Sequence, residues 1–157
     1  DLTNNEDLSY TGPVYVGTPS SYGEVIYDTG SGTFTITSTL CSTCSSQIYN
    51  PSSSSTAESE GMAGVLVYGS ATLTGSYYQD EVCLADDAEC ALMSLFAITY
   101  QDGLDSVDGI LGLSPEFTNS SSIVYALYDE GQIPELVLGM LIGDTDQESV
   151  VMFGGFN

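Results

Sequence analysis

The pattern that most limits the fold of this chain is a succession of short β-rich runs, each soon broken by glycine, serine or threonine. Residues 33–37 alternate polar and apolar side chains, which is typical of a strand with one buried face. Gly69-Ser70-Ala71 separates two such runs, 65–68 and 72–78, and this spacing predicts a β-hairpin. Further strands are expected at residues 10–16, 25–27, 92–100 and 150–153. Many short strands with tight turns indicate an all-β fold, either a barrel or a sandwich.

Residues 121–130 are the one segment expected to be helical, so the fold should contain only one or two short helices. Asn119 and the serines that follow it can cap the N-terminus, and Gly131 can end the helix. Apolar side chains form a stripe along this segment: Ile123, Val124 and Leu127. The 157 residues contain no linker and no repeat of fixed period, so we expect a single domain over residues 1–157.

The chain has 22 acidic residues but no Lys, Arg or His, which gives a formal net charge of -22. Nucleic-acid binding is not expected, because no side chain can neutralise phosphates. The same deficit excludes a polybasic membrane patch and any catalytic His or Lys. No apolar run reaches the roughly 18 residues of a spanning helix, so no membrane insertion is expected. The charge suits either an extracellular surface or an acidic compartment.

This composition also predicts how stability depends on pH. Without cationic neighbours, the carboxyl groups should mostly raise one another's pKa. Groups whose pKa is raised in the folded state stabilise the fold at low pH, and that contribution is lost as the pH rises through the folded values. We therefore expect a higher melting temperature near about pH 4 than near about pH 8.

The four cysteines fall into two close pairs, Cys41 with Cys44 and Cys83 with Cys90. Four cysteines allow three pairings, and the two local pairings are the most natural. Cys41-Ser-Thr-Cys44 alone could be half a zinc site or a redox pair. The second pair lacks that spacing and the chain has no His, so two structural disulfides in a secreted protein are favoured.

Two weaker patterns concern modification and metals. Asn119-Ser120-Ser121 is an acceptor triplet for N-glycosylation and agrees with a secreted protein. Asp102, Asp105 and Asp108 recur every three residues but lack the ordered spacing of a calcium loop, so a solvated turn is the better interpretation. No metal and no other cofactor is therefore expected.

The segment most informative about chemistry is Val25-Ile26-Tyr27-Asp28-Thr29-Gly30-Ser31-Gly32. A carboxylate follows three apolar strand residues and precedes a turn of small residues, where Gly30 can adopt backbone angles closed to other residues. Thr29 and Ser31 bring hydroxyl groups close to this carboxylate. Asp28-Thr29-Gly30 by itself also occurs as an ordinary turn, so the segment alone leaves both a catalytic and a structural interpretation open.

The Asp28 segment is one of six short segments that occur in a recognisable order along the chain. They are residues 10–19 with Gly-Thr-Pro, 28–31 with Asp-Thr-Gly-Ser, 41–56 with the first cysteine pair and a Pro-Ser stretch, 68–75, 108–113 with Asp-Gly-Ile-Leu-Gly-Leu, and 150–155. Together they resemble the N-terminal lobe of the pepsin family of aspartic peptidases over nearly the whole chain. The resemblance implies a single pepsin-like lobe, a closed or partly closed barrel with a flap hairpin.

The resemblance also implies a mechanism. Two lobes each contribute one Asp, and aspartic proteases are the standard example of carboxyl groups that share a proton. The ionised member activates a water and the protonated member polarises the peptide carbonyl, so Asp28 would be the first of the pair. Thr29 would lock the active-site loops of the two lobes together, and Ser31 would hydrogen-bond the carboxylate. A lid over an extended peptide or protein substrate would come from Tyr68, Gly69 and Ser70.

The chain also departs from the family pattern. Asp144-Thr145-Asp146 is the only other Asp-Thr and lacks the glycine, so a second catalytic Asp must come from a C-terminal half, a separate chain or a homodimer mate. Thr35 occupies the position where the family commonly has a Trp bonded to the flap Tyr, and Ala71 replaces a common flap Gly. We expect an acid endopeptidase lobe from a secreted or acidic lumenal location, vacuole-like or lysosome-like; the alternative is a non-catalytic binding or assembly protein.

Overall fold

The computed structural model describes residues 1–6, 8–115, 121–144 and 147–155, and most of them are in strands. The strands are β1 (Thr3–Asn5), β2 (Ser9–Val16), β3 (Ser21–Asp28), β4 (Thr35–Thr37), β5 (Glu58–Val67), β6 (Thr72–Ala85), β7 (Ala88–Asp102), β8 (Gly109–Gly112), β9 (Leu138–Leu141) and β10 (Val150–Phe153). One helix is found in the described part of the chain, α1 (Ile123–Asp129). The prediction of an all-β fold with few helices is confirmed.

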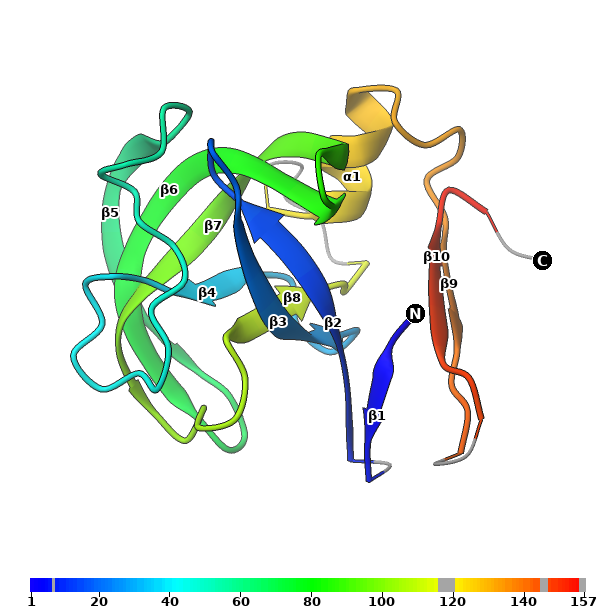
Figure 1. The fold of residues 1–157 in the computed structure, drawn as a ribbon, viewed down its shortest axis with the longest axis horizontal. Helices are drawn as coiled ribbons and strands as arrows, with labels where there is room; N and C mark the ends of the chain where they lie inside the picture. The colour runs from blue at the N-terminus through cyan, green and yellow to red at the C-terminus, as the bar shows by residue number, and fades with distance from the viewer. Residues whose placement is uncertain (7, 116–120, 145–146, 156–157) are drawn as a thin grey trace.

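Eight of the strands form one sheet in the order β1-β2-β3-β8-β4-β7-β6-β5. Because β2 also pairs with β6, the strands from β2 to β6 in this order close into a ring (Figure 1). β5 and β1 lie outside the ring, at the two ends of the sheet. Where a closed or partly closed barrel was expected, the structure shows this ring of strands within one sheet.

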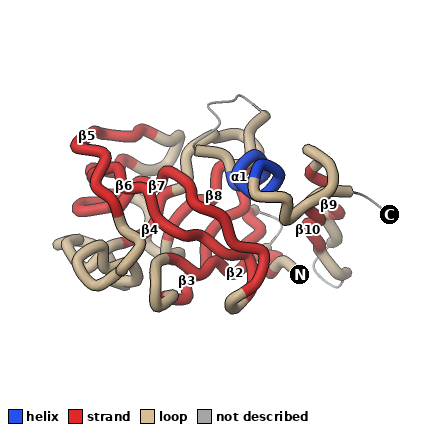
Figure 2. The backbone as a smooth tube through the Cα atoms, turned by 90° about the horizontal axis from the view of Figure 1, so that it is seen from above, coloured by secondary structure: helices blue, strands red, loops and turns tan. Residues whose placement is uncertain are grey.

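β9 and β10 form a separate two-stranded sheet on the side of α1 (Figures 1 and 2). A backbone bridge between Leu2 and Ser149 joins the N-terminal segment to the start of β10. The strand at 150–153 was expected, whereas β9 was not, because its sequence Leu-Gly-Met-Leu shows no alternation. The N-terminal segment at Leu2 and the start of β10 therefore lie side by side, although they are far apart in the sequence.

The interior divides into two clusters of buried side chains. The larger, here called the main core, fills the ring and reaches α1. Its members are Leu2, Val14, Val16, Val25, Tyr27, Phe34, Ile36, Tyr49, Val82, Leu84, Ala91, Met93, Leu95, Ala97, Leu111, Leu113, Ile123, Val124, Ala126, Leu127 and Ile133. The smaller, here called the flap-side core, consists of Cys41, Ala71, Leu73, Phe96, Ile98, Leu104 and Ile110.

Residues 33–37 differ from the expected half-buried strand. Only Thr35–Thr37 are in the strand, and all three side chains are buried. Both faces of β4 are covered: Ile36 packs in the main core, whereas on the other face the Thr35 hydroxyl accepts from the Ile110 N–H and the Thr37 hydroxyl is hydrogen-bonded to that of Ser46. Alternation along a short run therefore predicted the strand correctly but not its burial.

The helix is shorter than the expected 121–130. Ser122 takes the N-cap position but makes no side-chain capping hydrogen bond, and the other suggested cap, Asn119, lies outside the described residues. The expected apolar stripe is buried, and Gly131 follows the C-cap residue with a φ of 69°. Glycine tolerates this left-handed conformation, which explains why the helix ends there. None of the helical segments in the described ranges is long and apolar enough to cross a membrane.

Both expected disulfides are present, Cys41–Cys44 and Cys83–Cys90. Cys83 and Cys90 are direct partners across β6 and β7, and the pairing continues outward to Ala85 and Ala88. The acidic residues between the cysteines are exposed, as expected for a hairpin tip: Asp86, Asp87 and Glu89. This tip lies at the opposite end of β6 from the β5–β6 turn.

Candidate active site

Strand β3 presents two different faces to the two cores. Val25 and Tyr27 point into the main core, whereas Ile26 packs against the flap-side core. Successive side chains of a strand point to opposite faces, so Asp28, the last residue of β3, lies on the same face as Ile26. The Asp28 side chain is half-buried, and Thr29 and Gly30 after it are exposed. The carboxylate therefore emerges at the end of a buried strand, beside the smaller core.

The backbone of the Asp28 loop is held by the chain that follows β8. β3 and β8 are parallel with Asp28 opposite Gly112, and the Leu113 N–H donates to the Asp28 carbonyl at 2.7 Å. Ser114 N–H donates to the Ser31 carbonyl at 2.8 Å. A Cβ on Gly112 would lie 2.5 Å from the backbone nitrogen of Thr33, so only glycine allows the loop to approach this closely.

The Asp28 carboxylate is oriented by its own turn. Its Oδ1 accepts a hydrogen bond of 2.9 Å from the Gly30 N–H. The expected hydrogen bond from Ser31 is not formed in this structure, since the buried Ser31 hydroxyl has no hydrogen-bond partner among the described residues. Within the described part of the chain, the Gly30 amide is therefore the one hydrogen-bond donor that orients the carboxylate.

The β5–β6 hairpin brings Tyr68 to this carboxylate. The hairpin is closed by a 2.7 Å hydrogen bond from the Tyr68 N–H to the Ala71 carbonyl, and the turn exposes Gly69 and Ser70. Burial raises the pKa of Tyr68 to about 12, and the negative charge of Asp28 adds to the rise. The Ser31 hydroxyl lowers that pKa by a smaller amount, although its contact with Tyr68 falls short of ordinary hydrogen-bond geometry. The predicted hairpin is thus confirmed.

Thr35, where the pepsin family commonly has a Trp, forms a hydrogen bond with the backbone instead. Its side chain is fully buried, and its hydroxyl accepts a 3.0 Å hydrogen bond from the Ile110 N–H. The adjacent strand β8 is therefore tied to β4 by a side chain as well as by the ladder. The Tyr68 side chain instead packs against the flap-side core.

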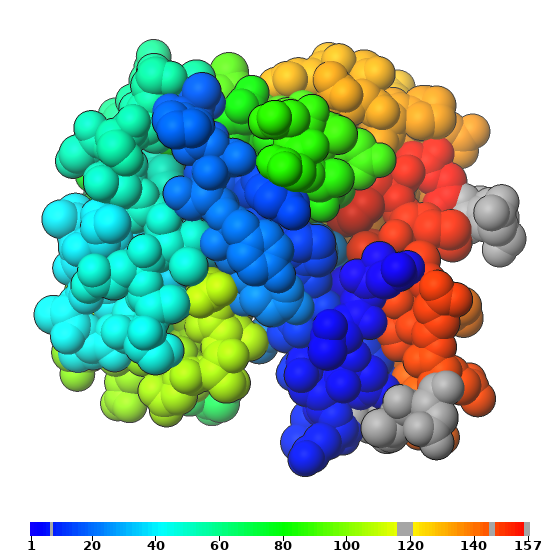
Figure 3. All heavy atoms as spheres, viewed as in Figure 1, coloured from blue at the N-terminus to red at the C-terminus, as the bar shows by residue number. Residues whose placement is uncertain are grey.

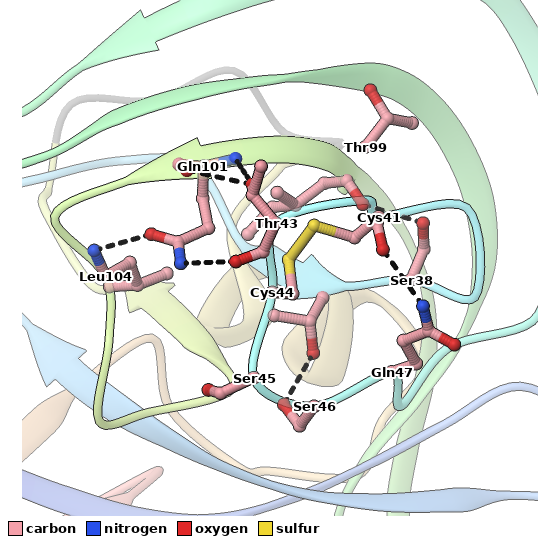
Figure 4. Close-up of a disulfide and its surroundings, with 12 residues drawn as sticks. Ser38, Cys41, Thr43, Cys44, Ser45, Ser46, Gln47, Thr99, Gln101 and Leu104 are labelled. Carbon is pink, nitrogen blue, oxygen red and sulfur yellow. Dashed lines mark hydrogen bonds between the residues drawn. A yellow bond between two sulfur atoms is a disulfide. The ribbon is translucent and has the colours of Figure 1, made fainter.

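The loop of the first disulfide is tied by hydrogen bonds to the end of β7 (Figure 4). Gln101 is buried, its N–H donates to the Thr43 hydroxyl at 2.8 Å, and its Nε2 donates to the Thr43 carbonyl at 3.2 Å. Its Oε1 accepts a 2.7 Å hydrogen bond from the Leu104 N–H. Gln101 therefore connects the disulfide loop to Leu104 of the flap-side core. Nothing in the sequence indicated this role, because Thr43 and Gln101 are 58 residues apart.

An apolar pocket of about 290 Å³ opens next to Asp28, with Thr29 in its wall. Its other lining residues come from the chain after β8, from the start of α1 and from β9: Leu113, Ser114, Pro115, Ser122, Val124, Leu136 and Leu138. Thr29 is exposed, so the pocket reaches the surface beside the candidate carboxylate. Of the residues singled out by sequence, Asp28, Thr29, Gly30, Ser31 and Tyr68 are thus brought together.

Comparison with known proteins places this arrangement in a family. The family model described as eukaryotic aspartyl protease matches residues 9–157 of the chain. The chain belongs to the eukaryotic aspartyl protease family. The pepsin-like resemblance inferred from six short segments is therefore confirmed.

Individual aspartyl proteases align over almost the whole chain. Procardosin-A of Cynara cardunculus is 32% identical over 99% of the chain and 33% of its own length. Pepsin A of Suncus murinus is 30% identical over 99% of the chain and 43% of its own length. Vacuolar protease A of Neurospora crassa is 31% identical over 99% of the chain and 42% of its own length. The chain thus spans between a third and a half of the aspartyl proteases that it matches.

Proposed function

We propose that this chain is one lobe of an acid-acting aspartic endopeptidase and that Asp28 is its catalytic carboxylate. The observation that carries the proposal is the setting of Asp28: half-buried at the end of β3, oriented by the Gly30 N–H and approached by Tyr68 of the hairpin. A carboxylate fixed in direction but open on one side can hold the water that attacks a peptide carbonyl.

The reaction needs a second carboxyl group. Two close carboxyl groups share a proton, so one is ionised and acts as base while the other remains an acid. We propose that the second Asp comes from a C-terminal half, a separate chain or a second copy of this chain. The greater length of the relatives supports the first source. The exposed Thr29 beside the apolar pocket offers a surface for the second lobe.

The substrate in this proposal is an extended peptide or protein segment beneath the hairpin. The turn at Gly69 and Ser70 is exposed, so its backbone groups can pair with an added strand. Closure of the hairpin would exclude water and bring Tyr68 onto the substrate. A secreted or acidic lumenal location agrees with the lack of cations and with the two disulfides.

The decisive experiment is a peptide-cleavage assay of the complete protein at about pH 3–5, with and without a statine-type inhibitor. Asp28→Asn should reduce kcat by about 10²–10⁴-fold or more, because it removes a group that acts in proton transfer. Asp86→Asn at the exposed hairpin tip is the matched control and should cleave normally. Cleavage that survives Asp28→Asn would refute the role of Asp28, and sedimentation would separate a homodimer from a monomer.

A further inference from the structure

A second hollow, here called the polar groove, lies between the N-terminal strands and the segment that precedes β8. Figure 3 shows it as a notch between the blue N-terminal residues and the yellow-green segment. It has a volume of about 300 Å³. Strands β1 and β2 contribute hydroxyl and amide side chains, and Ser106 and Val107 form the opposite wall. Among the described residues that line it, Glu24 is the only charged one.

Glu24 is held in place by two neighbours. The Tyr22 hydroxyl donates a 2.7 Å hydrogen bond to Oε2 of Glu24, and this bond is the main cause that raises the pKa of Tyr22 to about 12. The backbone N–H of Glu24 donates to Oδ2 of Asp108 at 2.8 Å, which fixes the strand at this point. No described residue donates to Oε1 of Glu24, so this oxygen is left for a ligand.

The chain cannot supply a cation to this carboxylate itself. It has no Lys, Arg or His, so neutralisation of Glu24 by a side chain must come from another molecule. The hydroxyl and amide groups around it can accept further N–H donors. A groove with one ionised oxygen and several neutral acceptors is suited to an ammonium or guanidinium group.

The position of Glu24 on β3 relates the polar groove to the candidate carboxylate. Glu24, Ile26 and Asp28 alternate with the buried residues of β3 and so share one face of the strand. Four residues at about 3.3 Å each place Glu24 about 13 Å along the strand from Asp28. A peptide that lies extended parallel to this face of β3 has about the same rise per residue, so its side chain about four residues from the cleaved bond would reach the groove.

We propose that Glu24 is a specificity-determining residue that receives a Lys or Arg side chain of the substrate, about four residues from the cleaved bond. The proposal rests on the peptide-cleaving function proposed above. It assigns no part in bond cleavage to Glu24, which acts only by placing the peptide along the cleft.

The test measures binding first, so that it does not depend on activity. Extended, blocked peptides that differ only by lysine or norleucine, moved one position at a time, are titrated calorimetrically into this chain at about pH 6, where the lysine side chain is charged. At one position the lysine peptide should bind about tenfold more tightly than its norleucine partner, as an opposite charge in a partly enclosed groove allows. Glu24→Gln should reduce this preference to less than about twofold.

The control must distinguish binding at Glu24 from non-specific electrostatic attraction, because a chain of net charge -22 attracts any cationic peptide. Glu89→Gln, at the exposed hairpin tip, changes the net charge by the same amount and should keep the preference. Glu24→Asp keeps the charge on a shorter side chain and should retain part of it. A preference that is absent from the wild-type chain, or equal in the Glu24→Gln and Glu89→Gln variants, would overturn the proposal.

The complete protein provides the second measurement. There kcat/KM for the lysine peptide should fall about tenfold in Glu24→Gln, while that for the norleucine peptide stays unchanged. If Asp28→Asn abolishes cleavage but no lysine preference exists, the catalytic proposal stands and this one fails. If lysine binding depends on Glu24 but no peptide is cleaved, the groove is real and the catalytic proposal fails.

Discussion

The main core and the flap-side core differ in the parts of the fold that they connect. The main core unites strands around the whole ring with α1, so its packing depends on nearly every element of the fold. The flap-side core is smaller, and its members adjoin segments outside the ring: Cys41 lies in the disulfide loop, Ala71 at the hairpin turn and Leu104 in the segment held by Gln101. The difference indicates that one core determines stability and the other determines the position of the hairpin above Asp28.

Strand β3 belongs to both cores, which gives the candidate carboxylate its setting. Tyr27 anchors the strand in the main core, and Ile26 turns toward the flap-side core. Asp28 follows at the point where the two meet. A change in either core should therefore affect Asp28, but through different observables, and three measurements test this division.

Phe34→Ala should have the largest effect, because Phe34 is fully buried in the main core. Truncation of a buried aromatic side chain leaves a cavity and should lower the free energy of unfolding by about 3–5 kcal/mol. Urea unfolding followed by far-ultraviolet circular dichroism measures it. Tyr22→Phe, at an exposed position, is the control and should change little. A loss below about 1 kcal/mol would show that the main core is not the stabilising unit.

Leu104→Ala should have a smaller effect on stability, about 2–4 kcal/mol at most, because the flap-side core is small and can relax around the gap. Its distinctive effect should be on the hairpin, through Leu104 and Gln101. Exposure of Tyr68 to water should return its pKa from about 12 toward the ordinary value of 10.0. Absorbance of the tyrosinate, compared with a Tyr68→Phe variant, isolates this group. An unchanged Tyr68 titration in Leu104→Ala would contradict the division between the cores.

Asp28→Asn should have the smallest of the three effects and act on one tyrosine alone. The charge of Asp28 contributes to the raised pKa of Tyr68, whereas burial is the main cause of the raised pKa values of Tyr27 and Tyr49 in the main core. Removing that charge should lower the pKa of Tyr68 only, again measured as tyrosinate absorbance. A shift at all three tyrosines would mean a change of fold instead.

The raised pKa of Tyr68 also makes the free energy of unfolding depend on pH. A phenol whose pKa is higher in the folded state stabilises the fold below its unfolded value of 10.0, and this contribution is lost as the pH rises through about 12 for Tyr68. In Leu104→Ala the folded pKa of Tyr68 lies closer to the unfolded value, so the free energy of unfolding should fall less steeply between about pH 10 and pH 12 than in Asp86→Asn, which leaves the cores unchanged.

Local patterns in the sequence predicted the local parts of the fold. A small-residue turn between two β-rich runs predicted the β5–β6 hairpin, close spacing predicted both disulfides, and an apolar stripe before Gly131 predicted the helix. The order of strands was not predictable in the same way, because β3 pairs with the distant β8 and β4 with the distant β7. Thr35 is buried by residues distant in the sequence, such as Ile110, so the sequence near Thr35 could not reveal its burial.

The same limit applies to the candidate site. Asp28 and Tyr68 were identified from their motifs, and the Asp-Gly-Ile-Leu-Gly-Leu segment included the Gly112 on which the loop closes. Gln101 and Glu24 carried no signal, because a glutamine near a strand end and a glutamate within a strand are ordinary residues there. Their roles depend on the partners that the fold brings to them, Thr43 in one case and the polar groove in the other.

The Cys83–Cys90 hairpin has a practical consequence. Its base is sealed by a covalent bond and by continued strand pairing, its tip is exposed, and it lies at the far end of β6 from the turn above Asp28. A small fluorophore or an affinity tag inserted between Asp86 and Asp87 would be attached to a rigid hairpin and would leave the site around Asp28 unchanged. The rotational diffusion of such a label would report the arrival of a second lobe in real time, even in a protein made catalytically silent.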